Sequence, residues 1–179
     1  GADISSMRVS DIAAKAGIGK GTTYEYFSSK EEMVIKAMVY LVDSMVKRIL
    51  MQMESVETFR DKFMMLLDEM EEKAKQRACI LKYLNMLSDM NLCEQMHDVL
   101  LEDEEAKKSS PMRIMQYLIE QGKKEGIIGN HFSQAYLETT MFSRVISFVI
   151  YADGDLGILR SDYGEMKQDL YEGLCRELA

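Results

Sequence analysis

Apolar residues recur along the whole chain at intervals of three and four, and no segment keeps a strict alternation of apolar and polar positions. Such spacing places apolar side chains on one face of an α-helix. The longest stripe runs from Met33 to Met53 and predicts a helix that reaches about residue 54. Shorter stripes predict further helices over 59–70, 80–87, 92–100, 114–119, 133–149 and 163–178. The pattern therefore predicts an all-α fold.

Two short helices precede the long one. Ile12, Ala13 and Ala16 share one face of a helix over about 9–16, and Gly17 supplies the left-handed residue that ends it. A second short helix follows Gly19 over residues 20–27. These features predict a helix-turn-helix, in which the second helix enters the major groove of DNA.

Serine and proline residues mark where later helices begin. Ser29, with Glu32 three residues on, predicts a capping box at the start of the long helix. Ser110-Pro111 is either the start of a new helix or a kink in a continuous one. No apolar run approaches the ~20 residues that a membrane span needs, so no membrane segment is expected.

Composition and charge narrow the function. The chain has 179 residues, one Pro, no Trp and a formal charge of −8. Residues 1–48 hold seven basic and six acidic residues, whereas the remainder holds 15 basic and 24 acidic. A polyanion should therefore bind within the first 50 residues. The three Cys are widely spaced, which favours reduced thiols in a cytoplasm and no disulfide or zinc site.

The residues of the second short helix suit DNA binding. Lysine side chains can pair with phosphates, a glycine allows close approach of the backbone, and hydroxyl groups can bond to bases or phosphates. The candidate DNA-binding residues are Lys20, Gly21, Thr22, Thr23, Tyr24, Tyr26 and Lys30.

The segment from Ser10 to Met33 resembles the signature of the TetR family of transcriptional repressors. The family pattern has an "IA…AG" helix, a "GxxY.yF" recognition helix and then "sKeeL", and this chain reads IAAKAG, GTTYEYF and SKEEM at those places. The resemblance implies an all-helical homodimer with a DNA-binding head over 1–30 and an effector-binding and dimerisation domain over 31–179. It also implies that the candidate residues above contact DNA.

Two departures from the family pattern stand at the amino end. The family usually has Thr or Ser before the apolar residue that opens its second helix, whereas Arg8 precedes Val9 here. The family also has a whole helix before this point, so we expect roughly 15–25 further residues before Gly1, enough for one helix and a short tail.

The implied function is a ligand-responsive repressor that a small apolar effector releases from its operator. Methionine is flexible and lines adaptable apolar pockets, although it also fills gaps in helical cores. The candidate effector-binding residues on the helices that the resemblance assigns to the pocket are Met64, Met65, Met86, Met90, Met96, Met115 and Met141.

The carboxyl-terminal helices carry the candidate dimer interface. An apolar stretch over 146–151 and a leucine stripe in the last helix could face a second subunit or form the core of one. The candidate interface residues are Ile146, Val149, Ile150, Leu170, Leu174 and Leu178.

Two other functions stay open at this stage. Glu94 and His97 form a Glu-x-x-His pair like those of di-iron helical bundles, but the second such motif is missing. A helical adaptor for other proteins is the remaining alternative. We expect no enzyme activity, no cofactor and no metal.

Overall fold

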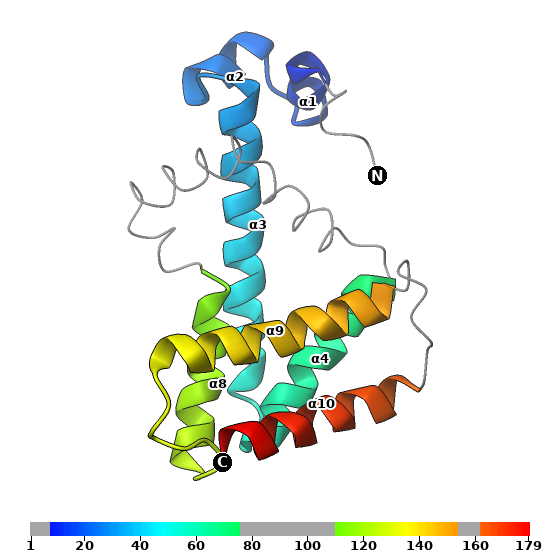
Figure 1. Ribbon diagram of the computed structural model, residues 1–179. Coiled ribbons are helices and arrows are strands. Elements are labelled where there is room, and N and C mark those ends of the chain that lie inside the picture. Colours follow the sequence, from blue (N-terminus) through cyan, green and yellow to red (C-terminus); the bar gives the residue numbers. More distant parts are fainter. Residues whose placement is uncertain (1–7, 76–109, 154–161) are drawn as a thin grey trace.

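The computed structural model describes residues 8–75, 110–153 and 162–179, and their regular structure is entirely helical (Figure 1). This confirms the predicted all-α fold. The helices are α1 (Val9–Lys15), α2 (Lys20–Tyr26), α3 (Lys30–Met53), α4 (Phe59–Lys75), α8 (Met112–Lys124), α9 (Gln134–Asp153) and α10 (Tyr163–Leu178).

Helix α3 joins two parts of unequal size. The head, made of α1 and α2, lies at its amino end, and the body, made of α4, α8, α9 and α10, surrounds its carboxyl end (Figure 1). Helix α9 packs against α4, α8 and α10. The body is the larger of these two parts.

The apolar stripes of the body helices meet in one core. Phe59, Phe63 and Leu67 of α4 are fully buried, as are Leu118 of α8 and Phe148 of α9. Burying such a side chain stabilises the fold by about 1.5–3 kcal/mol relative to leaving it in water. Helix α3 contributes Val46, Ile49 and Met53 to the same core.

The stripe along α3 does not bury as a continuous band. Tyr40 is 70% exposed and Leu41 is 65% exposed, although both lie on the stripe that predicted the helix. The reason is geometric, because the middle of α3 lies between the head and the body (Figure 1). The period predicted the helix correctly but not which of its turns are covered.

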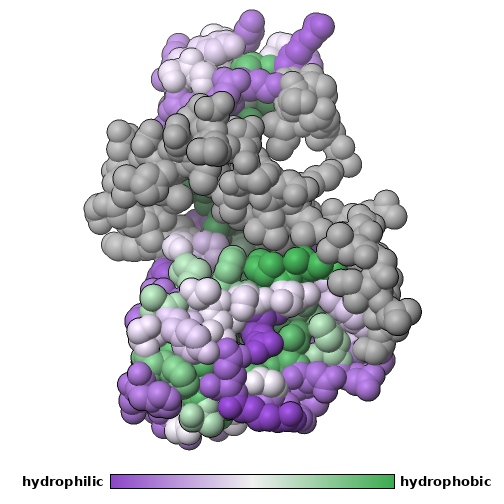
Figure 2. Space-filling model, in the orientation of Figure 1, coloured by the Kyte–Doolittle hydropathy of each residue, from purple (hydrophilic) through white to green (hydrophobic). Residues whose placement is uncertain are grey.

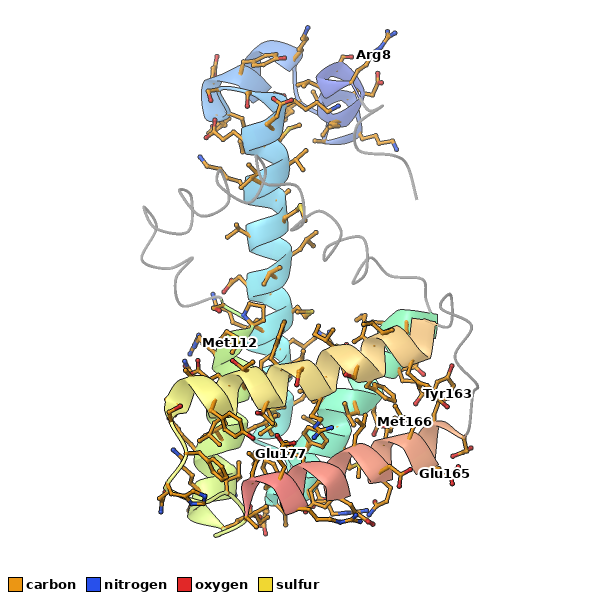
Figure 3. All side chains as sticks on the ribbon, in the orientation of Figure 1. Arg8, Met112, Tyr163, Glu165, Met166 and Glu177 are labelled. Atoms are coloured by element: carbon orange, nitrogen blue, oxygen red, sulfur yellow. The ribbon has the colours of Figure 1, made fainter. Side chains whose placement is uncertain are left out.

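Polar contacts join the body helices at their edges. Lys167 of α10 pairs with Asp68 (2.5 Å) and Glu71 of α4. Glu177, labelled in Figure 3, accepts hydrogen bonds from the hydroxyl of Tyr136 (2.8 Å) and from Arg144, both on α9. The Tyr136 bond and then the Arg144 guanidinium lower the pKa of Glu177. These pairs fix α10 against both neighbours.

Backbone and hydroxyl groups finish several helix ends. The hydroxyl of Ser110 accepts from the amide of Met112 (3.2 Å), so α8 begins directly after Pro111. The amide of Gly129, in the turn before α9, donates to the carbonyl of Leu178 (2.7 Å) at the end of α10.

The candidate dimer residues separate into two groups. Val149, Leu170, Leu174 and Leu178 lie inside the core of a single subunit and are at most 8% exposed. Their burial fits the core, the second of the two alternatives that the sequence left open. Ile146 and Ile150 are only partly buried on α9, and they stay candidates.

Replacing Gly122 by alanine should destabilise the body. A Cβ atom there would lie 2.6 Å from Cδ1 of Ile128 and 3.3 Å from Cδ2 of Phe59. Overpacking of this kind costs about 1–3 kcal/mol, which urea denaturation would measure.

Gly173 of α10 provides the matched control, because a Cβ atom there meets nothing within 4 Å. Alanine at this position should leave the free energy of unfolding unchanged or raise it by ~0.5–1 kcal/mol. Equal effects at both glycines would contradict the packing that we describe.

Candidate nucleic-acid interface

Helix α1 ends in a turn that only a left-handed residue can form. Gly17 has φ +70°, and its amide donates to the carbonyl of Ala14 (3.1 Å). The amide of Ile18 donates to the carbonyl of Ala13 (3.0 Å). Together these two bonds form a Schellman motif, which satisfies the last carbonyls of α1 and turns the chain into α2. The cap predicted at Gly17 is confirmed.

Arg8 stands at the start of α1, where the family pattern has Thr or Ser (Figure 3). No side chain caps this end of the helix, and Arg8 itself is exposed. The cap that Thr or Ser would supply is therefore absent, while the guanidinium remains at the surface of the head.

One face of α2 lies open at the tip of the head. Tyr24 is 47% exposed and Tyr26 is 71% exposed, and Lys20, Gly21 and Thr22 are exposed beside them. The ammonium of Lys20 lies 5.8 Å from the centre of the Tyr24 ring. Figure 2 shows this end of the molecule as largely hydrophilic. One short helix therefore presents a cation, hydroxyl groups and, at Gly21, a backbone that a ligand can approach closely.

Thr23 differs from the other candidates on α2. It is 3% exposed, and its hydroxyl donates to the carbonyl of Gly19 (3.3 Å) at the start of the helix. Because α2 has only seven residues, one of its faces must pack inward, and Thr23 lies on that face. Thr23 therefore packs inside the head, unlike the exposed candidates Lys20, Gly21, Thr22, Tyr24 and Tyr26.

The corner between α2 and α3 is held by a charged capping box. The amide of Glu32 donates to the hydroxyl oxygen of Ser29 (3.0 Å), as predicted. The Glu32 carboxylate accepts from the amide and the hydroxyl of Ser28 (2.6 and 2.5 Å) and pairs with Lys36 (2.7 Å). Lys36 and then Ser28 lower the pKa of Glu32 to about 2. The sequence did not reveal the Ser28 and Lys36 contacts.

This corner sets the angle between the recognition helix and α3. Lys30, the last DNA-binding candidate, opens α3 and is partly buried. The Lys36 ammonium also lies 5.9 Å from the centre of the Phe27 ring at the end of α2. The same few residues thus position both α2 and the start of α3.

The candidate effector-binding methionines have mixed surroundings. Met115 and Met141 are buried in the body core, and Met64 and Met65 of α4 are partly buried. Met86, Met90 and Met96 lie outside the described residues, as do Glu94 and His97.

The described residues form no candidate metal site and no membrane-spanning helix. No group of three or more His, Cys, Asp or Glu is placed to hold a metal ion within 8–75, 110–153 and 162–179. In the same ranges no helix is long and apolar enough to cross a membrane.

The geometry of the head agrees with a known family. Residues 2–37 match the bacterial regulatory proteins of the tetR family. The head of the chain thus has the DNA-binding domain of the tetR family. The matched region contains α1, the glycine turn, α2 and the capped start of α3, so these elements form a helix-turn-helix of the tetR type.

Solved structures extend the likeness over the whole fold. The transcriptional regulator FadR from Bacillus subtilis, in complex with stearoyl-CoA, is 18% identical with a TM-score of 0.68, covering 98% of this chain and 91% of that one. The fatty acid degradation regulator FadR from Bacillus halodurans is 18% identical with a TM-score of 0.63, covering 96% and 86%. At such identity the likeness shows the fold. The search of curated protein sequences found no match to this chain.

Replacing Glu32 by glutamine should weaken the head in a pH-dependent way. The folded-state pKa of about 2 lies below the ordinary 4.5, so the stabilisation by the carboxylate is present above pH 4.5 and is lost as pH falls toward 2. Thermal unfolding should therefore show a lower Tm for E32Q at pH 6, and the gap should shrink below pH 4.5.

Glu31→Gln is the control, because Glu31 is an acid in the same first turn of α3 without the Ser28 contacts. It should leave Tm nearly unchanged at pH 6. A gap between E32Q and the unaltered protein that is as large at pH 2.5 as at pH 6 would contradict the role given to the carboxylate.

Proposed function

We propose that this chain is a homodimeric, cytoplasmic repressor that binds operator DNA through α2 and is released by a small apolar effector. The single observation that carries the proposal is the exposed face of α2, where Tyr24 and Tyr26 stand out beside Lys20. Exposed aromatic residues beside a cation, on a helix that follows a tight glycine turn, fit the recognition helix of a helix-turn-helix.

The distribution of charge along the chain also supports the head as the DNA-binding surface. The first 48 residues carry seven basic and six acidic residues within a chain of net charge −8. Phosphate contacts from Lys20 and Lys30 would fix the register, while Thr22, Tyr24 and Tyr26 would reach phosphates or base edges. The acidic body would be repelled by DNA, so binding would be directed to the head.

A second copy of the chain would complete the DNA-binding unit. Two-fold symmetric sites are read by two recognition helices one helical turn apart, about 34 Å. Ile146 and Ile150 of α9 are partly exposed apolar residues that a symmetric contact could bury.

A fatty acyl-CoA is the effector class that we favour. The similar fold of the Bacillus subtilis FadR holds stearoyl-CoA, and the body of this chain has the same layout. Sixteen methionines would give an apolar pocket the adaptability that a long acyl chain needs. Met64 and Met65 of α4 would belong to such a pocket.

By linkage, effector and DNA must weaken each other by the same factor. An effector that prefers one conformation by about 3 kcal/mol would change operator affinity roughly 150-fold. The heads would then no longer match the spacing of the two half-sites.

Replacing Lys20 by methionine should weaken binding to DNA and reduce its dependence on salt. Loss of one phosphate contact per subunit should lower the slope of log Kd against log salt by about one for each subunit. Fluorescence anisotropy with DNA from upstream of the gene, at several salt concentrations, would measure both effects.

The matched control is Lys47→Met, because Lys47 is an exposed lysine on α3 outside the head. It should keep the wild-type slope. Absence of any salt-sensitive, sequence-preferring complex with the unaltered chain would exclude the proposed function.

Stearoyl-CoA should release the wild-type protein from that DNA, and free coenzyme A should not. The acyl chain provides the apolar area whose burial drives binding, so a short acetyl-CoA should also fail. Titration of a preformed complex would measure the release. If all three compounds act alike or none acts, the effector class is wrong while the DNA-binding proposal stands.

A further inference from the structure

Lys62 of α4 is a buried cation at the foot of α3. It is 3% exposed, although lysine is almost never fully buried without compensation. Its ammonium donates to the carbonyl of Met53 (2.6 Å) and to that of Val56. In the part of the chain that the structure describes, no carboxylate lies within ion-pair distance of it.

The contacts of Lys62 match the needs of a helix end. Met53 is the last residue of α3, and the last carbonyls of a helix have no partner within it. They also form the negative end of the helix dipole, which favours a cation. The face of the Tyr117 ring, 5.4 Å from the ammonium, gives the charge a third partner, from α8. One side chain therefore ties together α3, α4 and α8.

Among the described residues, the contacts of α3 with the body lie toward its carboxyl end. None of the ten residues from Lys36 to Met45 is fully buried. We call this part of α3, residues 36–45, the shaft. Below it, Arg48 pairs with Glu69 of α4 (2.6 Å), and Val46, Ile49 and Met53 enter the core. Val42 and Met45 pack against the edge of this core, so among the described residues α3 meets the body from Val42 to Met53.

We propose that Lys62 is a positioning residue that sets the direction of α3 and so places the DNA-binding head. The helix has 24 residues and is about 36 Å long at ~1.5 Å per residue, so a turn of about 5° at its foot would move the head by about 3 Å. We call the contacts of Lys62 with Met53, Val56 and Tyr117 the clamp. Because Lys62 lies on α4 and Tyr117 on α8, a change in the packing of α4 or α8 would move α3, and with it the head, through these contacts.

A merely stabilising role makes a different prediction. If Lys62 only added to the free energy of folding, its loss would lower Tm without changing where the head lies. If Lys62 positions the head, its loss would let α3 leave the body over a wider range of angles, even in the fully folded protein.

The distance between head and body tests this directly. Spin labels at Lys15→Cys in α1 and Glu120→Cys in α8 would report it, since both positions are exposed. The native cysteines are replaced by serine, and labelled chains are mixed with excess unlabelled chain so that only distances within one chain are measured. We expect Lys62→Met to broaden or shift the distribution by about 3 Å or more, as the lever length implies.

Three further variants make the result decisive. Lys47→Met removes an exposed lysine of α3 and should leave the distribution unchanged. Gly122→Ala lowers stability without touching the clamp, so it should lower Tm with little broadening. Tyr117→Leu removes only the ring contact, should broaden the distribution less, and keeps the test available if Lys62→Met fails to fold.

An unchanged distribution in Lys62→Met, or equal broadening in Gly122→Ala, would overturn the proposal. A second reading, operator affinity, rests on the proposed function, and we expect Lys62→Met to lower it about tenfold while Lys47→Met does not. If the unaltered chain binds no DNA, the proposed function fails, yet the distance measurement still decides the role of Lys62.

Discussion

The burial of the foot of α3 in the body core is the constraint on which the rest of the structure depends. Val46 and Met53 are fully buried and Ile49 nearly so, against the aromatic residues of α4. Since the helix is continuous from Lys30 to Met53, whatever orients its buried end also orients the head. Arg48 and Lys62 add directional contacts to this non-directional packing, because hydrogen bonds and ion pairs specify angles that apolar contact leaves loose.

Local chemistry made the head predictable from sequence. Gly17 needs a positive φ, Ser29 and Glu32 form a capping box, and both features act over a few residues. Such signals depend little on distant parts of the chain, so the helix boundaries they imply agree with the structure. The capping-box pattern did not predict that Glu32 also accepts hydrogen bonds from Ser28, because these bonds depend on the extended residues between α2 and α3.

Tertiary packing limited what the stripes could predict. A period of 3.6 residues identifies an apolar face, but it does not identify what covers that face. Tyr40 and Leu41 belong to such a face and are exposed, whereas Leu170, Leu174 and Leu178 belong to another and are buried within one subunit. Thr23 shows the same limit on α2, where polarity favoured exposure and the seven-residue helix turned it inward. The burial of Lys62 could not be predicted from the sequence, because a lysine in an amphipathic helix normally faces solvent.

The head and the body are joined through the shaft of α3, so they can evolve as separate modules. Lys36 holds the corner with α2 and Val42 meets the core, so the residues between them are the part of α3 whose identities can drift most freely. The number of residues in the shaft is more strongly constrained than their identities, because it sets the rotation of the head about the helix axis. An insertion of one residue rotates everything beyond it by about 100°, whereas an insertion of seven changes the azimuth by only about 20°. Exchange of heads between relatives should therefore succeed when shaft lengths differ by whole pairs of turns, and the helical phase of this segment becomes an inherited property of the regulator.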